Sequence, residues 1–290
     1  MLGEHLLGIY EKAFDPQDSW AERLRKAKAL GFDYVEISID ESDERLQRLD
    51  WSRDEMEALR RSCFQEGIGF YSMCLSAHRR FPFGSADPEI RVKAHEIMEK
   101  AIDFAVAMGI RVIQLAGYDV YYERSTPLSV KLFQEAMVWA AKKAAQKQVM
   151  LAMEIMDTSF MNSISKHMAY ESMIRSPWYK VYPDVGNISA WPENNVDFEM
   201  ARGADSIVAV HLKDTLAVTD QFGGKFKCVP FGSGCVDFVR RFRQLERNGY
   251  TGPYMIEMWY AEGTDEMREI ANAKAWMELQ FSAAMEEATC

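Results

Sequence analysis

Short apolar runs alternate with amphipathic segments along almost the whole chain. The first run, at 6–10, predicts a strand, and Trp20, Leu24 and Ala27 then recur at helical spacing. The same order repeats to the end of the chain. Strands are expected over 6–10, 34–39, 70–75, 112–116, 149–155, 180–185, 207–212 and 254–258. Helices are expected over 18–30, 52–65, 87–108, 127–146, 163–174, 196–202, 236–248 and 265–285.

Glycine repeatedly marks the turn from a helix to the next strand, in LGF, EGI, MGI and NGY. Strands that alternate with helices form a parallel sheet, and eight such units close an α/β barrel of the (β/α)8 TIM type. A doubly wound open sheet is the second possibility. No segment of the 290 residues has the composition of a linker, so we expect one domain over 1–290.

Four consecutive predicted strands each end in a side chain that can bind a metal. They are LAMEIMD with Glu154, VYPDVGN with Asp184, VAVHLKD with His211 and YMIEMWY with Glu257. A carboxylate or imidazole in a buried strand is costly unless it is paired or bound to a cation. Each one alone is explained by an ordinary ion pair or hydrogen bond, but four in succession favour convergence at the carboxyl end of a barrel.

Three carboxylates and one imidazole form an oxygen-rich ligand set. Such a set suits one divalent ion, with Mn²⁺, Zn²⁺, Mg²⁺ and Co²⁺ as the candidates. The choice among these ions depends on supply as well as on affinity.

Charge and cysteine content narrow the class of protein. The 44 acidic and 34 basic residues give a formal net charge of −10, which opposes binding to nucleic acid. The five cysteines are odd in number and form no CxxC pair, as expected for reduced thiols in the cytoplasm. We find no signal peptide or membrane-spanning run, so we expect a cytoplasmic protein without a membrane partner.

The segments AMEIMD, YPDVGN, HLKD and MIEMWY, in this order and at helix-sized separations, resemble the xylose-isomerase-like barrel superfamily. With the loop PFGSGCVDF, the chain is most similar to the branch of L-ribulose-5-phosphate 3-epimerases. This resemblance implies an isomerase that interconverts L-ribulose 5-phosphate and L-xylulose 5-phosphate, as in ascorbate catabolism. It also implies a homo-oligomer, either a dimer or a tetramer.

The resemblance assigns a role to each of the four strand-end residues. Glu154 and Glu257 match the two carboxylates that bind the metal and exchange protons with opposite faces of the sugar. Asp184 and His211 match the two remaining metal ligands. Inversion at a carbon next to a ketone calls for these groups, because the proton leaves one face and returns to the other while a Lewis acid stabilises the enediolate.

Further residues are candidates for binding the sugar phosphate. Gly232, Ser233 and Gly234 precede a predicted helix, whose N-terminus favours an anion. The full set of candidate substrate-binding residues is His78, Asn187, Lys12, Lys227, Gly232, Ser233 and Gly234. Lys213 and Lys225 are further cations near the expected mouth, Glu36 and Gln114 are polar residues within strands, and Arg79 and Arg80 are either substrate contacts or solvated.

Two positions depart from the family pattern. Asn187 stands where many free-ketose epimerases of this superfamily have a histidine, and Ser233 stands where relatives often have an acidic residue. The first departure would alter a contact to the sugar. The second could ease phosphate binding or have no effect.

Four other functions are the alternatives to this one. An aldose–ketose isomerase, or a 3-epimerase of another ketose, would use the same four residues. An endonuclease on the same barrel needs a trinuclear zinc cluster, whereas this chain has only five histidines. A non-catalytic barrel could use the seven tryptophans as anchors, but it would have no need of four converging ligands.

Overall fold

The structure of the chain, a computed structural model, describes residues 2–286. Eight parallel strands pair in the order β6-β5-β4-β3-β2-β1-β8-β7. The strands are β1 Leu7–Tyr10, β2 Tyr34–Ile39, β3 Gly69–Leu75, β4 Val112–Leu115, β5 Met150–Glu154, β6 Tyr179–Tyr182, β7 Val210–Leu212 and β8 Tyr254–Ile256. The outer strands β6 and β7 meet through two parallel bridges, Val181 with Ile207 and Asp184 with His211, so the sheet curls into a nearly closed barrel.

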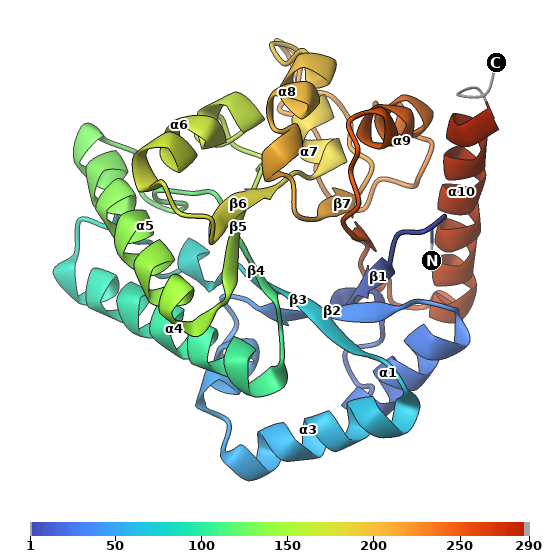
Figure 1. Cartoon of the computed structure of the whole chain (residues 1–290), viewed down its shortest axis with the longest axis horizontal. Helices are drawn as coiled ribbons and strands as arrows, with labels where there is room; N and C mark the ends of the chain where they lie inside the picture. The colour runs from blue at the N-terminus through green and yellow to red at the C-terminus, as the bar shows by residue number, and fades with distance from the viewer. Residues whose placement is uncertain (1, 287–290) are drawn as a thin grey trace.

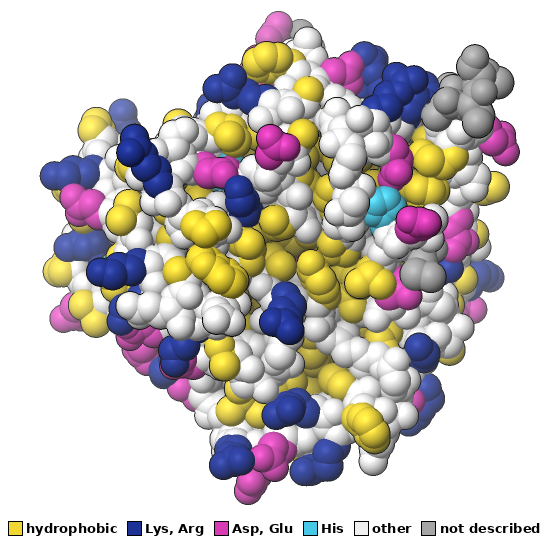
Figure 2. Space-filling model, viewed as in Figure 1, with side chains coloured by type: hydrophobic (Ala, Val, Ile, Leu, Met, Phe, Trp, Pro, Cys, Tyr) yellow, Lys and Arg dark blue, Asp and Glu magenta, His cyan; other side chains and the backbone are white. Residues whose placement is uncertain are grey.

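Helices surround this barrel in chain order, as Figure 1 shows. The longer ones are α1 Trp20–Ala29, α3 Arg53–Glu66, α4 Pro88–Met108, α5 Pro127–Lys147, α6 Ile164–Ile174, α8 Val196–Arg202, α9 Phe238–Arg247 and α10 Glu266–Glu286. Two short helices, α2 Asp43–Leu46 and α7 Val185–Ser189, and the 3-10 turns η1 Glu11–Ala13, η2 Gln47–Asp50, η3 Ala77–Arg79 and η4 Ala204–Ser206 lie in the connections. On the face seen in Figure 2, hydrophobic side chains gather towards the centre and charged side chains ring the rim.

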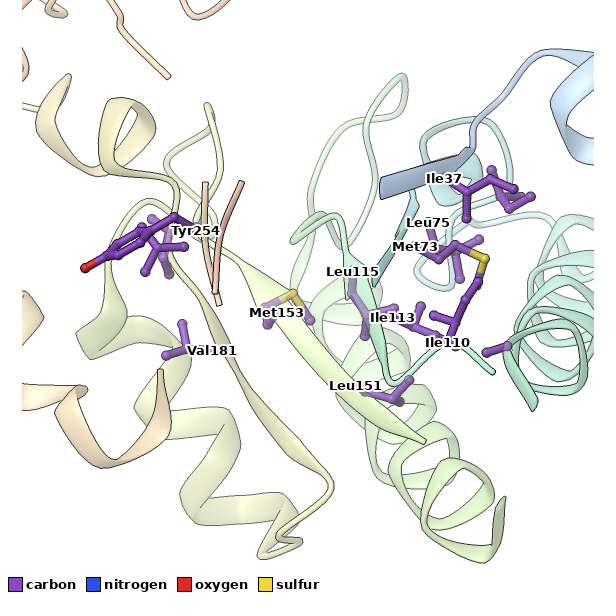
Figure 3. Close-up of a cluster of buried hydrophobic side chains, with 14 of the residues drawn as sticks. Ile37, Met73, Leu75, Ile110, Ile113, Leu115, Leu151, Met153, Val181 and Tyr254 are labelled. Atoms are coloured by element: carbon purple, nitrogen blue, oxygen red, sulfur yellow. The ribbon is translucent and has the colours of Figure 1, made fainter. Parts of the chain in front are cut away.

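The strands are buried on both sides, and their alternation sorts side chains into two layers. One layer faces the helices and is aliphatic; Figure 3 shows part of it, including Ile37, Met73, Leu75, Ile113, Leu115, Leu151, Met153 and Val181. The residues between them face the barrel axis, where cross-strand pairs such as Cys74 with Gln114 and Gln114 with Ala152 are largely polar or small. The outer layer therefore supplies the core, and the inner layer supplies the chemistry.

Local sequence signals explain where the helices begin and end. Ser19 and Ser52 cap α1 and α3 in capping boxes with the glutamates three residues later. Gly109 ends α4 in the left-handed region, with φ of 72°, which a glycine adopts without strain. These local signals determine where the helices begin and end.

The predicted (β/α)8 barrel is confirmed, and the open doubly wound sheet is wrong because β6 and β7 meet. The predicted sixth strand is too long: β6 ends at Tyr182, and Asp184 turns the chain into α7.

Among the described residues, Cys63, Cys74, Cys228 and Cys235 are free thiols, and Cys290 lies outside them. No helix within residues 2–286 has both the length and the apolar character needed to cross a membrane.

Candidate active site

Four strand ends bring their ligating groups to one point in the barrel. Glu154 is the last residue of β5, Asp184 follows β6, His211 lies within β7, and Glu257 follows β8. All four are buried, and one ligating atom from each lies within 4.8 Å of the others. The convergence predicted from the sequence is therefore present in the structure.

His211 lies between two carboxylates. Its Nδ1 is 3.1 Å from Glu154 Oε1 and 3.8 Å from Glu257 Oε2, so this nitrogen faces the cluster. Its Nε2 is 3.1 Å from Glu36 Oε1, on the side away from the cluster. Burial alone would lower the pKa of His211, but Glu36 and Glu154 outweigh burial and raise it well above its ordinary value.

Lys213 is the cation of the cluster. Its Nζ lies 2.6 Å from Asp184 Oδ2 and 2.9 Å from Glu257 Oε2. Burial by itself would raise the pKa of Glu257, yet Lys213 and His211 hold it below its ordinary value. Burial raises the pKa of Glu154, against the opposing effect of His211, so the two glutamates are shifted in opposite directions.

Backbone contacts hold Asp184 in place. As the N-cap of α7, its Oδ1 accepts hydrogen bonds from the amides of Gly186 at 2.7 Å and Asn187 at 2.9 Å. A Cβ at position 186 would lie 2.6 Å from Lys213 O, so only glycine allows this close approach of α7 to β7. Oδ2 is thereby directed towards the cluster, where it makes no hydrogen bond and contacts Lys213 only as an ion pair.

The donor set fits a divalent cation. Glu36, Glu154, Asp184 and Glu257 bring four carboxylates into or against the cluster, while His211 and Lys213 are the cationic groups that pair with them. Asp184 Oδ2 and Glu257 Oε2 are buried without a hydrogen bond. Both oxygens share one cation, Lys213, and the four carboxylates outnumber the two cationic groups. A bound divalent cation would compensate this excess of negative charge.

A cavity opens above the cluster, and its walls come from the loops after several strands. Its lining comprises Tyr10, Lys12, Cys74, Ser76, Arg79, Glu154, Met156, Asp157, Asn187, Lys213, Lys227, Glu257 and Trp259. Asn187 donates from Nδ2 to Ile155 O at 2.9 Å, and its buried Oδ1 has no partner. Asn187 thus lines the cavity with one buried acceptor whose hydrogen-bonding capacity is unused.

Of the four predicted substrate-binding residues outside the glycine-rich loop, three line the cavity and one does not. Lys12, Asn187 and Lys227 line the cavity. His78 does not, because its Nε2 lies 3.1 Å from Ala94 O and its ring stacks on Phe83, on the side of α4. Arg79, the residue after His78, lines the cavity instead.

The remaining histidines lie away from the cluster. His5 pairs with Glu246, His95 contacts the carbonyl of Arg91, and His167 contacts Glu171. A trinuclear zinc cluster needs additional histidines at the barrel mouth, and within residues 2–286 this chain places only His211 there. The endonuclease interpretation is therefore not supported.

The glycine-rich loop before α9 is bound to a carboxylate of its own chain. Asp214 Oδ2 accepts the amides of Gly232 and Gly234, each at 2.9 Å, and Oδ1 accepts those of Thr215 and Val236. Ser233 is exposed. The amides of Gly232 and Gly234 that were expected to bind phosphate are thus directed at Asp214.

We expect Asp214→Ala to destabilise the protein by about 1–3 kcal/mol, because four backbone donors lose their acceptor. The free energy of unfolding in urea measures this change. Asp220→Ala, at an exposed position in the same connection, is the matched control and should leave that free energy unchanged. Equal stability of the two variants would contradict the structural role of Asp214.

Several site residues were not identified from the sequence, among them Tyr10, Cys74, Ser76 and Asp157. Tyr10 and Cys74 share the inward-facing side of β1 and β3, and the Tyr10 hydroxyl lies 3.6 Å from Cys74 Sγ. Their signal is the period of two along each strand, in which they alternate with the outward-facing aliphatic residues Ile9, Met73 and Leu75. Asp157 lies three residues beyond Glu154, in a connection that carries no such period.

Comparison with known proteins places the chain in a family. Residues 24–280 match the family model described as xylose isomerase-like TIM barrel. A putative L-ribulose-5-phosphate 3-epimerase, SgbU, of Escherichia coli (strain K12) is 54% identical over 280 residues, covering 97% of this chain and 98% of that protein. L-ribulose-5-phosphate 3-epimerase UlaE of Escherichia coli (strain SE11) is 51% identical, covering 96% and 95%.

Solved structures agree on the fold. A structure of L-ribulose 3-epimerase superposes with a TM-score of 0.78 at 18% identity, covering 98% of this chain and 96% of that one. At this level of identity, the likeness concerns the barrel alone. The four-residue cluster and the curated relatives carry the functional argument.

Proposed function

Since the chain belongs to the xylose isomerase-like TIM barrel family and is a carbohydrate epimerase, we propose that it interconverts L-ribulose 5-phosphate and L-xylulose 5-phosphate. The observation that carries this proposal is the cluster of Glu154, Asp184, His211 and Glu257 beneath a cavity lined by both glutamates. The near-full-length relatives supply the substrate class.

The two substrates differ only in configuration at carbon 3. One glutamate removes the proton from carbon 3, the electron pair of the broken C–H bond moves into an enediolate, and the other glutamate returns a proton to the opposite face. Glu154 and Glu257 extend from β5 and β8, with β6 and β7 between them, so they approach the cavity from different sides. The sugar loses one proton and gains one, so substrate and product have the same composition.

A divalent cation held by Glu154, Asp184, His211 and Glu257 would supply Lewis acidity that stabilises the negative charge developing on the sugar. Mn²⁺, Zn²⁺, Mg²⁺ and Co²⁺ all suit three carboxylates and one imidazole. The side chain of Asn187 would contact the sugar, since it lines the cavity.

Three cations around the cavity suit a phosphate group. Lys12 Nζ pairs with Asp40 at 2.6 Å, and Lys227 Nζ lies 5.9 Å from the ring of Trp259. Arg79 lies over the ring of Tyr118 at 5.4 Å, and its buried Nε has no hydrogen-bond partner. Arg79 lines the cavity and its Nη2 donates to the Tyr118 hydroxyl at 3.4 Å, so its guanidinium is held at the cavity wall, and we assign it the leading role in binding phosphate.

We expect Arg79→Met to lower kcat/KM for the phosphorylated sugar by about 10–100-fold, the loss of a charge-assisted hydrogen bond of about 1.5–3 kcal/mol. Turnover of unphosphorylated L-ribulose should change little, because that sugar lacks the group that Arg79 binds. Arg80→Met is the matched control: Arg80 is exposed and pairs with Asp43 outside the cavity. An equal loss with both sugars would show that Arg79 acts through the structure of the site.

The reaction itself is tested by hydrogen–deuterium exchange in heavy water, followed by NMR on L-ribulose 5-phosphate. Metal-dependent exchange at carbon 3 together with formation of L-xylulose 5-phosphate is the expected result. Exchange at carbon 1 with appearance of an aldose would make the protein an isomerase of the aldose–ketose type. No exchange with metal bound would exclude this substrate.

A further inference from the structure

Glu36 is a buried carboxylate that the proposed reaction does not use. It lies in β2, facing the barrel axis, with no exposed surface. Among the described residues its one ion-pair partner is His211, and no lysine or arginine neutralises it. Burying a carboxylate without a cationic partner costs free energy of folding, and the hydrogen bonds of Glu36 must offset that cost.

The hydrogen bonds of Glu36 have a fixed direction. Its Oε2 accepts from the hydroxyls of Ser72 and Tyr182, the latter at 3.2 Å. Oε1 faces His211 Nε2 at 3.1 Å. An ionised carboxylate can only accept, so Nε2 must donate and carry the ring proton.

This direction determines which nitrogen of His211 can bind a metal. With the proton on Nε2, the lone pair of the neutral ring lies on Nδ1, the nitrogen that is 3.1 Å from Glu154 Oε1 and faces the cluster. Histidines that bind metals commonly donate their second nitrogen to a carboxylate, which fixes both tautomer and ring orientation. Glu36 and His211 have this arrangement, with Glu36 at the second nitrogen.

We propose that Glu36 is a positioning residue that holds His211 in the tautomer and orientation needed for metal binding. This inference rests on the proposed function, because it requires that the cluster binds a divalent cation. It assigns Glu36 no contact with substrate, and Glu36 is absent from the cavity lining.

Replacement by glutamine tests the direction of these bonds with almost no change in volume. The hydroxyls of Ser72 and Tyr182 hold the amide oxygen, so the amide NH₂ turns towards His211 Nε2. Two donors then face each other, and His211 is driven to the tautomer with its proton on Nδ1. We expect Glu36→Gln to weaken Zn²⁺ and Mn²⁺ binding by about 10–100-fold, measured by competition with a chelator.

Two further variants separate positioning from general destabilisation. Ser72→Ala removes one donor but keeps the carboxylate, so its metal affinity should equal that of the wild type. The triple variant Glu36→Gln, Ser72→Ala, Tyr182→Phe removes both hydroxyls, so the amide oxygen can turn to His211 and metal affinity should recover. In the zinc-loaded wild type, ¹⁵N NMR should show the proton of His211 on Nε2, and this signal should be lost in Glu36→Gln.

Unchanged metal affinity in a folded Glu36→Gln protein would overturn the role of Glu36 while leaving the proposed function intact. A loss that the triple variant does not reverse would also overturn it, since a structural defect predicts no recovery. Failure of the wild-type protein to bind either metal would instead overturn the proposed function, and this inference with it.

Discussion

Glu154→Gln and Glu257→Gln are each expected to lower the rate of epimerisation by at least about 1,000-fold, because each removes one of two proton-transferring groups. Both residues are buried in the cavity lining, and both contribute a ligating atom to the cluster. Neither can replace the other, since they extend from strands separated by β6 and β7. Rates are to be measured at saturating metal, so that weaker metal binding does not account for the loss.

The two variants should differ in the proton exchange that survives. With one base intact, the enzyme can still remove and return a proton on one face of the sugar. In heavy water, one variant should therefore exchange the carbon 3 proton of L-ribulose 5-phosphate without forming product, and the other should do so with L-xylulose 5-phosphate. This pattern would identify which glutamate serves which face.

Asp157→Asn is the matched control for these two substitutions. Asp157 lines the same cavity but lies outside the cluster, and its Oδ1 accepts a hydrogen bond from Tyr118. The asparagine oxygen can still accept from Tyr118, so this replacement should leave epimerisation within about tenfold of the wild type. Full activity in either glutamine variant would contradict the two-carboxylate mechanism.

Much of the fold could be predicted because the barrel strands are short, fully buried and separated by well-capped helices. Predicted and observed strands coincide at 34–39, and most others differ by one or two residues at an end. The four ligands were predictable for a related reason: Glu154, Asp184, His211 and Glu257 are charged or polar residues at the ends of otherwise apolar runs. Burying such groups costs free energy unless they are paired or bound to a cation, so their presence in apolar runs indicates a site.

Residues in the connections were harder to predict, since no period relates them to the barrel. His78 and Arg79 are adjacent, yet one packs under α4 and the other lines the cavity. A 3-10 turn at Ala77–Arg79 sets this difference, and the sequence signals for such turns are weak. Likewise, Asp214 accepts hydrogen bonds from the glycine amides before α9. This contact depends on how the loop folds back over β7.

Removing the metal should abolish activity and lower stability together. Four carboxylates contact or form the cluster against His211 and Lys213, so a bound cation relieves repulsion that the chain alone leaves unbalanced. We expect chelation to reduce epimerisation by more than about 100-fold and addition of Mn²⁺, Zn²⁺, Co²⁺ or Mg²⁺ to restore it. At a free metal concentration 100 times Kd, folding should gain about 2.7 kcal/mol.

Asp184→Asn should reproduce metal removal without breaking the helix cap. The asparagine oxygen can still accept the amides of Gly186 and Asn187, while its NH₂ faces Lys213 in place of the ligating Oδ2. Metal should then no longer raise the unfolding free energy of this variant. Asp119→Asn replaces a buried carboxylate that binds Ser125 and Ser129 outside the cluster, so it should keep the metal-dependent gain. A chelated wild-type protein with full activity would contradict the metal site, because the carboxylates would then act on the sugar unaided.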